Sequence, residues 1–275
     1  MLTNPQFERM RRLASRLAGI ELLDRHRELL AHRTLRLGLR EEGRLDGLLA
    51  AAEGAEPGAS RQLVSLLTTN FSGFFRHPRH FVVAAEHAVR AVERCGRARL
   101  WSAAAASGEE PYSLAMALIE AFGREEPPVG VLATDIDKEV LAAAQRGEYP
   151  ERAVRLIEPG RRARFFQRTV GGGWSVAPAV RRLVEFRPLN LVHDAWGIGG
   201  PFEVIFCRNV LMYLETRHRD TVLQRLAALL VPEGLLLMDP AEHTAGARAL
   251  FTSVASGVYS RVAGAVPGAA AVAQA

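Results

Sequence analysis

Acidic residues stand at two places in the sequence where a strand is expected to end and a helix to begin. In the segment WSAAAASGEEPYSLAMAL, residues 101–118, a run of small residues leads through Gly108 to Glu109 and Glu110. Small residues let a ligand approach the backbone closely. Carboxylates here would repel a phosphate but would favour a cation or a sugar hydroxyl. Each glutamate alone is also compatible with a simpler role as a capping acid in the first turn of a helix.

The second acidic site is the segment TDID, residues 134–137. Asp135 lies 27 positions after Gly108 (135 minus 108), where an acid at the end of a second strand can hydrogen-bond ribose hydroxyls. Asp137 precedes a helix and is expected to be its N-cap. Neither a G-x-G-x-x-G fingerprint nor a P-loop is present, so the two sites predict a nucleoside pocket without a phosphate cradle. S-adenosylmethionine fits such a pocket, because it combines adenosine, a sulfonium cation and an amino acid without a phosphate.

Two further segments place polar side chains where they could join this pocket. TTNFSGFFRHPRHF, residues 68–81, interleaves polar residues with phenylalanines, and FCRNVLMYL, residues 206–214, follows another expected strand. Cys207 is expected to be a small wall residue, because no neighbouring base would convert it to a thiolate. No Ser-His-Asp order, H-E-x-x-H or C-x-x-C motif occurs, and His77 and His80 have no ligand cluster around them, so no metal site is expected.

For these segments to form one pocket, the fold must bring the ends of several strands close together. From about residue 97 onward, short apolar strands alternate with helices, which is typical of an α/β fold with helices on both faces of a parallel sheet. Ligands bind at the carboxyl ends of the strands in such sheets. Three glycines, 171–173, separate two β-rich runs and predict a β-hairpin insertion at about 166–188. The low-complexity end, residues 264–275, is expected to be disordered.

Residues 1–69 predict a separate, all-helical domain. Apolar residues recur there at three-to-four spacing and predict one buried face. We expect residues 70–96 to form a connecting segment and a helix that contribute to the cleft, and residues 97–263 to form the α/β domain. The expected members of the buried helical face are Phe7, Met10, Leu13, Leu17, Ile20, Leu22, Leu29, Leu30 and Leu35.

The composition is that of an ordinary soluble globular protein. The chain has 275 residues and a net charge of +5 carried almost wholly by arginine, since Lys138 is the only lysine. No apolar run reaches the length of a membrane span, the first residues contain no secretory signal, and the two cysteines fit a reducing cytoplasm. The positive charge has two interpretations, the codon composition of a GC-rich genome or a basic face for an acidic partner.

Taken together, these segments resemble the CheR family of chemotaxis-receptor methyltransferases. TTNFSGFFRHPRHF, WSAAAASGEEPYSLAMAL, ATDIDKEVLAAAQRGEY, FRPLNL and PFEVIFCRNVLMYL occur in the family's order, and the resemblance covers about residues 5–263. It implies a Rossmann-like S-adenosylmethionine-dependent methyltransferase domain with a small β-subdomain, preceded by the helical domain. It also implies methylation of receptor glutamate side chains to glutamate methyl esters, with S-adenosyl-L-homocysteine as the second product.

The resemblance also implies a set of site residues. Arg76 and Tyr213 are the implied catalytic residues, Arg76 orienting the incoming carboxylate and Tyr213 flanking the methyl group. Ser72 stands where the family usually has threonine and keeps the hydroxyl, whereas MDPAEH, residues 238–243, departs from the family's G-H-S-E. The implied cofactor-binding residues are Asn70, Ser72, Arg76, Glu110, Asp135, Asn190, Leu191, Cys207, Arg208 and Asn209.

The implied partner is the cytoplasmic helical region of methyl-accepting chemotaxis receptors. We expect a cytoplasmic monomer that binds no nucleic acid, does not insert into a membrane, and presents Arg33, Arg36 and Arg40 to acidic receptor helices. A glutamate carboxylate is already ionised at neutral pH, so the absence of a catalytic dyad is consistent with this chemistry. Two alternatives stay open: a related methyltransferase acting on another protein or a small-molecule carboxylate, and a non-catalytic regulatory module that binds the cofactor. An RNA methyltransferase would explain the basic charge, but the D/N-P-P-Y motif is absent.

Overall fold

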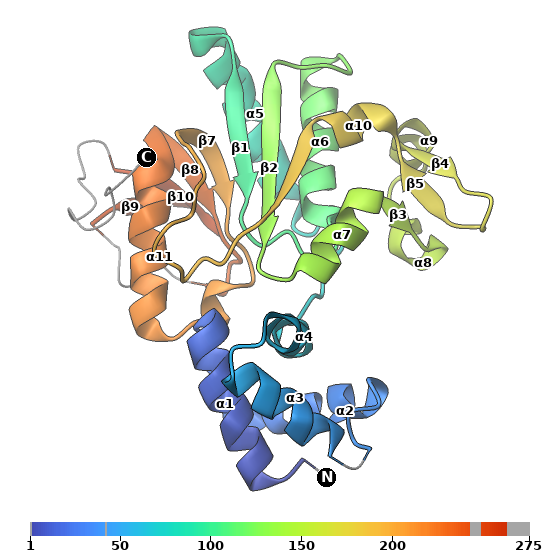
Figure 1. Ribbon diagram of the computed structural model, residues 1–275. Coiled ribbons are helices and arrows are strands. Elements are labelled where there is room, and N and C mark those ends of the chain that lie inside the picture. Colours follow the sequence, from blue (N-terminus) through green and yellow to red (C-terminus); the bar gives the residue numbers. More distant parts are fainter. Residues whose placement is uncertain (1, 42, 243–248, 263–275) are drawn as a thin grey trace.

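The computed structural model describes residues 2–41, 43–242 and 249–262 (Figure 1). The expected disordered tail, residues 264–275, lies outside the described residues. In chain order the elements are α1 (Asn4–Ala18), η1 (Asp24–His26), α2 (Arg27–Arg36), α3 (Arg44–Glu53), α4 (Pro57–Leu67), α5 (Pro78–Cys95), β1 (Ala98–Ser102), α6 (Glu109–Phe122), β2 (Val129–Asp135), α7 (Lys138–Arg146), β3 (Glu148–Tyr149), α8 (Glu151–Val154), α9 (Pro159–Phe165), β4 (Phe166–Arg168), β5 (Trp174–Val176), α10 (Pro178–Arg182), β6 (Val184–Pro188), β7 (Phe202–Phe206), η2 (Leu211–Tyr213), α11 (Thr216–Leu229), β8 (Leu230–Leu237), β9 (Phe251–Ala255) and β10 (Val258–Arg261).

A seven-stranded sheet organises the larger part of the chain, in the order β6-β2-β1-β7-β8-β10-β9. The first five strands in this order are parallel to one another, whereas β10 runs antiparallel to both β8 and β9. Leu100 and Val204 pack with α5 and α6 on one face, and Trp101 and Ile205 pack with α11 on the other. The predicted α/β class, with helices on both faces of a mostly parallel sheet, is confirmed.

The helical region α1–α4 has its own apolar core. Thr3 and Gln6 form a capping box that starts α1, and Phe7 is fully buried within the bundle. The predicted buried face is wrong at Leu29 and Leu35, which are 44% and 54% exposed. The short turn η1 precedes α2 and interrupts the helical period, so the apolar spacing of the preceding residues does not continue along α2.

A second, three-stranded sheet in the order β3-β5-β4 lies beside the main sheet together with α8 and α9 (Figure 1). β4 and β5 form an antiparallel hairpin around the glycines 171–173. The predicted insertion at 166–188 extends too far, because Val184–Pro188 is β6 and pairs in parallel with β2 of the main sheet. β6 is an edge strand with half-buried and exposed side chains, so its sequence lacks the continuous apolar run that marks a central strand.

The helical region lies at the carboxyl ends of the parallel strands (Figure 1). Ile20 and Leu214 form an antiparallel bridge between α1 and the segment that follows β7. The Asn190 side chain, beyond the end of β6, donates a hydrogen bond to the Leu17 carbonyl at 2.8 Å. These contacts place one face of the helical region opposite the edge of the sheet where strands end. Among the described residues, no helix has both the length and the hydropathy to cross a membrane.

Candidate active site

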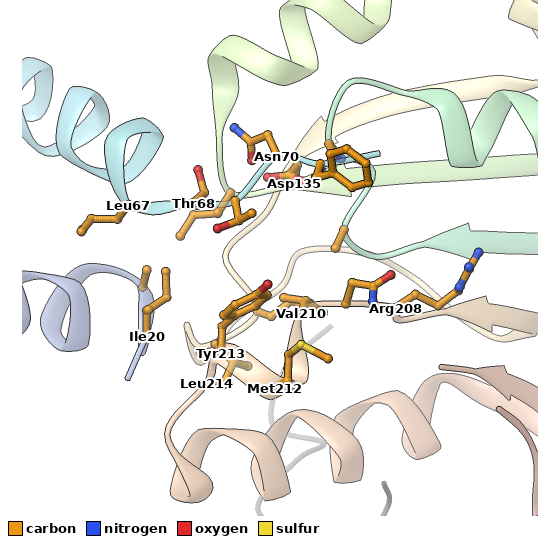
Figure 2. Close-up of a pocket in the computed structure, with 18 of the residues that line it drawn as sticks. Ile20, Leu67, Thr68, Asn70, Asp135, Arg208, Val210, Met212, Tyr213 and Leu214 are labelled. Atoms are coloured by element: carbon orange, nitrogen blue, oxygen red, sulfur yellow. Dashed lines mark hydrogen bonds between the residues drawn. The ribbon is translucent and has the colours of Figure 1, made fainter. Parts of the chain in front are cut away.

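A cavity of about 680 Å³ lies between the helical region and the strand ends (Figure 2). Its volume is within the range of small-molecule sites in proteins. Side chains of both regions line it, including the apolar Ile20, Leu22 and Leu67 from the helical side. The sequence-predicted residues that line it are Asn70, Ser72, Arg76, Glu110, Asp135, Asn190, Leu191, Arg208, Asn209 and Tyr213.

Glu110 lies at the start of α6 and forms a largely buried ion pair with Arg208 from the segment after β7. Its Oε2 accepts a hydrogen bond from Arg208 Nη1 at 3.0 Å, and its Oε1 accepts one from Ser102 Oγ at 2.8 Å. Burial raises the pKa of this carboxyl, although Arg208 and Ser102 oppose the shift. Arg208 also donates to the Arg76 carbonyl at 2.8 Å, so the pair joins three separate segments of the chain. Glu110 is therefore much more than a capping acid.

Gly108 is required by the tight turn between β1 and α6. Its φ of 94° lies in the left-handed region, and a Cβ there would come within 2.8 Å of the Ala144 side chain and 2.9 Å of the Tyr149 hydroxyl. The close packing of α7 and β3 against this turn therefore excludes any larger residue. Tyr149 also donates to the Ser107 carbonyl at 2.7 Å, which fixes the turn from the side of the small sheet.

Asp135 ends β2 and lies next to the same turn. Its Oδ2 accepts a hydrogen bond from the Ala106 amide at 2.8 Å, and its Oδ1 accepts one from the Asp137 amide at 3.0 Å. Burial raises the pKa of this carboxyl, and the two amides partly offset the effect. Each oxygen keeps a further lone pair for a ligand hydroxyl. The predicted N-cap at Asp137 is confirmed, and its other oxygen accepts from the Asn70 side chain at 2.9 Å.

Two predicted residues have side chains engaged elsewhere. Cys207 does not line the cavity but is fully buried in the core between the sheet and α11. Side chains alternate along an extended segment, so Arg208 faces the cavity while Cys207 faces the opposite side. Burial raises the pKa of the Cys207 thiol well above its ordinary value, with the charges of Glu242 and Glu110 acting in the same direction. The Asn190 side-chain amide donates to the Leu17 carbonyl and accepts from the Val192 N–H.

Tyr213 projects into the cavity from η2. Figure 2 shows its ring between Ile20 and Val210, with Asp135 across the cavity. The Tyr213 carbonyl accepts a hydrogen bond from the Glu21 amide at 2.8 Å. Main-chain bonds from the helical region thus hold the segment that carries this side chain.

The linker between α4 and α5 is anchored by two of its three phenylalanines. The Phe74 ring packs edge-on against Tyr149 and Phe166 of the small sheet, with centroid separations of 4.8 and 5.2 Å. Phe75 packs against Phe81 of α5. In contrast, Phe71 lines the cavity and is 80% exposed.

The prediction that Arg33 faces an acidic partner is wrong, because its guanidinium is bonded within the chain. It donates to the carbonyls of Leu66 at 2.9 Å and Thr68 at 2.6 Å, and to Thr69 Oγ1 at 3.3 Å. These carbonyls, at the end of α4 and in the linker, have no partner within the helix, and the half-buried guanidinium satisfies them. Burial lowers the pKa of Arg33. Arg33 therefore fixes the linker, while Arg36 and Arg40 are exposed.

The loop after β8 contributes two acidic residues that the sequence reasoning missed. Asp239 lines the cavity and accepts a hydrogen bond from Asn209 Nδ2 at 2.7 Å, and its Oδ2 lies 3.6 Å from Arg76 Nη2 and 3.4 Å from His77 Nε2. Burial alone would raise the pKa of Asp239, but the Ala241 amide, Asn209 and the neighbouring cations hold it below its ordinary value. Glu242 is buried next to it. Their position directly after a strand of the sheet was the available signal, because ligand sites gather at strand ends.

The arrangement binds and orients, and it offers no activated nucleophile. Its carboxylates are bonded to amides or to guanidinium groups, and its one nearby thiol faces the core. Among the described residues, no group of three or more His, Cys, Asp or Glu side chains could hold a metal ion. Carboxylates without a phosphate cradle suit a nucleoside with a positively charged substituent, and the residues present fit S-adenosylmethionine.

Comparison with known proteins gives a family match over most of the chain. The family model described as "CheR methyltransferase, SAM binding domain" matches residues 70–259. Chemotaxis protein methyltransferase 2 of Pseudomonas aeruginosa is 39% identical over 262 residues, which cover 94% of this chain and 93% of the relative. The chemotaxis protein methyltransferase of Escherichia coli is 36% identical over 266 residues, which cover 94% of this chain and 91% of the relative.

Proposed function

The chain belongs to the CheR family of methyltransferases, and from this premise we propose that it methylates glutamate side chains of chemotaxis receptors. It is an enzyme that uses S-adenosylmethionine and forms glutamate methyl esters. The observation that carries the site assignment is the meeting of Glu110, at the start of α6, and Asp135, at the end of β2, with Arg76 and Tyr213 around one cavity. The resemblance inferred from the sequence motifs is confirmed.

We assign cofactor binding to the sheet end of the cavity. Asp135 would hydrogen-bond the ribose hydroxyls through lone pairs that its amide partners leave free. The Glu110–Arg208 pair holds two opposite charges in a fixed position and would bind the amino-acid part of the cofactor. Asn70 is held by Asp137, so the linker closes over the same end. When bound, S-adenosylmethionine supplies an electrophilic methyl group on a positively charged sulfur.

The remaining residues orient the acceptor. The substrate glutamate is ionised at neutral pH, so the chain needs no general base to activate it. Arg76, whose side chain is 40% exposed, can take the incoming carboxylate in a charge-assisted pair. Tyr213, which lines the same cavity, would flank the reacting groups. Opposite charges disappear during transfer, and Ile20, Leu22 and Leu67 exclude water where this happens.

A methanol-release assay tests this function. Purified protein is mixed with methyl-labelled S-adenosylmethionine and receptor-containing membranes, and the membranes are then treated with base. Methyl esters hydrolyse and release labelled methanol, whereas methylated nitrogen does not. Label that is absent from the receptor, or that resists base, contradicts the proposal. Label on a soluble acid points to a small-molecule acceptor, and cofactor binding without transfer points to a regulatory module.

We further propose that the chain acts in the cytoplasm as a monomer on the helical region of the receptor. Cys95 is exposed and Cys207 is buried, and both are free thiols, which is consistent with a reducing compartment. Light scattering of the purified chain tests the monomer, and fractionation of cells with an antibody against the chain tests the compartment.

A further inference from the structure

Glu242 is a buried carboxylate with an unusual set of partners. It is 4% exposed, and its Oε2 accepts hydrogen bonds from the amides of Asn209 at 2.8 Å and Asp239 at 3.1 Å. Its Oε1 accepts one from the Met212 amide at 3.1 Å. Within the described residues its partners are these three main-chain amides. Burial raises the pKa of Glu242, and the three amides oppose that shift.

Two of the three amides that bond to Glu242, those of Asn209 and Met212, belong to the turn that carries Tyr213, and the third, that of Asp239, lies in the loop after β8. Between β7 and α11 the chain changes direction, with Asn209 in the left-handed region at a φ of 57°. Irregular backbone of this kind leaves amides without partners in a helix or strand, and buried amides need an acceptor. A carboxylate can accept from both of these amides, and from that of Asp239, because it has two oxygens and no hydrogen to present.

The same turn is held from the opposite side by the helical region. The Glu21 amide donates to the Tyr213 carbonyl at 2.8 Å, and the Glu215 amide donates to the Gly19 carbonyl at 2.9 Å. Tyr213 therefore has its main chain fixed by the bridge from the helical region, and the residue before it fixed by Glu242. Only its side chain is left to face the cavity, as Figure 2 shows.

We propose that Glu242 is a positioning residue for methyl transfer, acting through the turn that presents Tyr213 to the reacting groups. This rests on the proposed function, because that function places Tyr213 beside the methyl group. Glu242 does not touch the cofactor or the substrate; it fixes the direction in which Tyr213 points. The sequence of the loop after β8 departs from the family pattern, but the loop supplies Glu242, which positions the turn.

Glu242→Gln tests the proposal, because glutamine keeps the volume but turns an amide donor toward the gathered main-chain amides. A displacement on the order of 1 Å at a reacting group can cost about a hundredfold in rate, so we expect kcat to fall by about tenfold to a hundredfold. The dissociation constant for S-adenosylmethionine is measured on the same variant by calorimetry and is expected to change by less than about threefold, since Glu110 and Asp135 are untouched.

A double-mutant cycle with Tyr213→Ala separates positioning from general destabilisation. If Glu242 acts through the Tyr213 side chain, Glu242→Gln lowers kcat by less than about threefold in the Tyr213→Ala background. If the two effects multiply, Glu242 acts independently of Tyr213 and the proposal is overturned. Methylation of receptor by the unmodified protein is the separate test of the proposed function, so the two failures are distinguishable.

Glu158→Gln is the matched control. Glu158 also gathers main-chain amides, those of Gly160 at 2.8 Å and Arg161 at 2.7 Å, but it lies beside the small sheet and does not line the cavity. It should leave kcat within about twofold of the unmodified protein. Circular dichroism confirms folding, and if Glu242→Gln does not fold, Glu242→Asp replaces it in the same cycle. Normal kcat in the folded Glu242→Gln variant overturns the proposal.

Discussion

At the sheet end of the cavity, charged side chains are bonded to one another and to main-chain amides, whereas at the mouth the side chains face solvent. Glu110 and Arg208 are only 13% and 2% exposed and form a pair. At the mouth, Leu29, Phe71 and Met212 are 44%, 80% and 41% exposed. The polar groups of the sheet end are therefore held in place by contacts within the chain. The mouth, in contrast, presents exposed apolar side chains that a bound partner could bury.

This difference matches the two ligands of the reaction. A small cofactor gains affinity from fixed polar groups that need no rearrangement. A protein substrate brings its own surface and can bury exposed apolar side chains when it docks. We therefore expect the cofactor to bind at the sheet end and the receptor at the mouth, so that mutations at the two ends affect different constants.

The largest effect is expected when the buried pair is broken by Glu110→Ala. Arg208 would remain buried without its partner, which typically costs about 3–5 kcal/mol of folding free energy. The melting temperature should fall by about 6 °C or more, and S-adenosylmethionine binding should be lost with it. Ser102→Ala is the control, because it removes only one hydrogen bond to the same carboxylate and should cost about 1 kcal/mol. Equal, small shifts in both variants would mean that the sheet end is not organised by this pair.

Local sequence was enough to predict the organised end in part. Glu110 follows a strand and a turn, and Asp135 is the last residue of a strand, so the position of each is encoded within one short segment. Their partners are not: Arg208 lies 98 residues from Glu110, and only the folded sheet brings the two together. Arg33 shows the same limit, since its role depends on carbonyls more than 30 residues away that no local pattern reveals. The sequence already argues against Cys207 as a cofactor-binding residue, because side chains alternate along a strand and Cys207 cannot face the cavity when Arg208 does.

Asp135→Ala should act on the cofactor alone. Losing a hydrogen bond to a charged group costs about 1.5–3 kcal/mol, so the dissociation constant for S-adenosylmethionine should rise by about tenfold to a hundredfold. The Michaelis constant for receptor should stay within about twofold, because Asp135 is buried and offers a protein substrate little surface. Calorimetry on a variant shown to be folded measures the first quantity. Unchanged affinity would remove Asp135 from the cofactor site.

Arg76→Ala tests the boundary between the two ends. If Arg76 orients the substrate carboxylate, methyl transfer should fall by about tenfold to thirtyfold, less than for a fully buried pair because the side chain is 40% exposed. Cofactor affinity should fall much less. Arg76→Lys keeps the charge but loses the planar fork, so it should recover only part of the rate. Equal losses in affinity and rate would move Arg76 to the cofactor end, and normal transfer would exclude both roles.

Phe71→Ser probes the mouth. The phenyl ring is 80% exposed, so its removal should leave folding intact while reducing the apolar area that a substrate can bury. We expect the Michaelis constant for receptor to rise by about threefold to tenfold, a fraction of the transfer free energy of a phenylalanine side chain. Val82→Ser, at an exposed apolar residue of α5 that does not line the cavity, should change nothing. A loss of cofactor affinity at an unchanged Michaelis constant would show that Phe71 covers the cofactor and would break the comparison.

The smallest effect is expected beyond the mouth, on the exposed arginines of the helical region. Arg33 is excluded because it holds the linker, so the test uses the double reversal Arg36→Glu and Arg40→Glu, whose side chains are exposed and, among the described residues, form no ion pair. Charges on an acidic receptor surface would attract the unmodified face over about 10 Å at 0.1 M salt, which affects the rate of encounter more than the geometry of the bound complex.

The Michaelis constant of the double reversal for receptor should rise by about threefold at low salt, and its difference from the unmodified protein should shrink as salt is added. The same charge change at Arg97 and Arg124, exposed residues next to β1 and α6, leaves this face untouched and should have less effect. If both double reversals behave alike, the basic charge reflects codon composition and the receptor is recognised at the mouth alone.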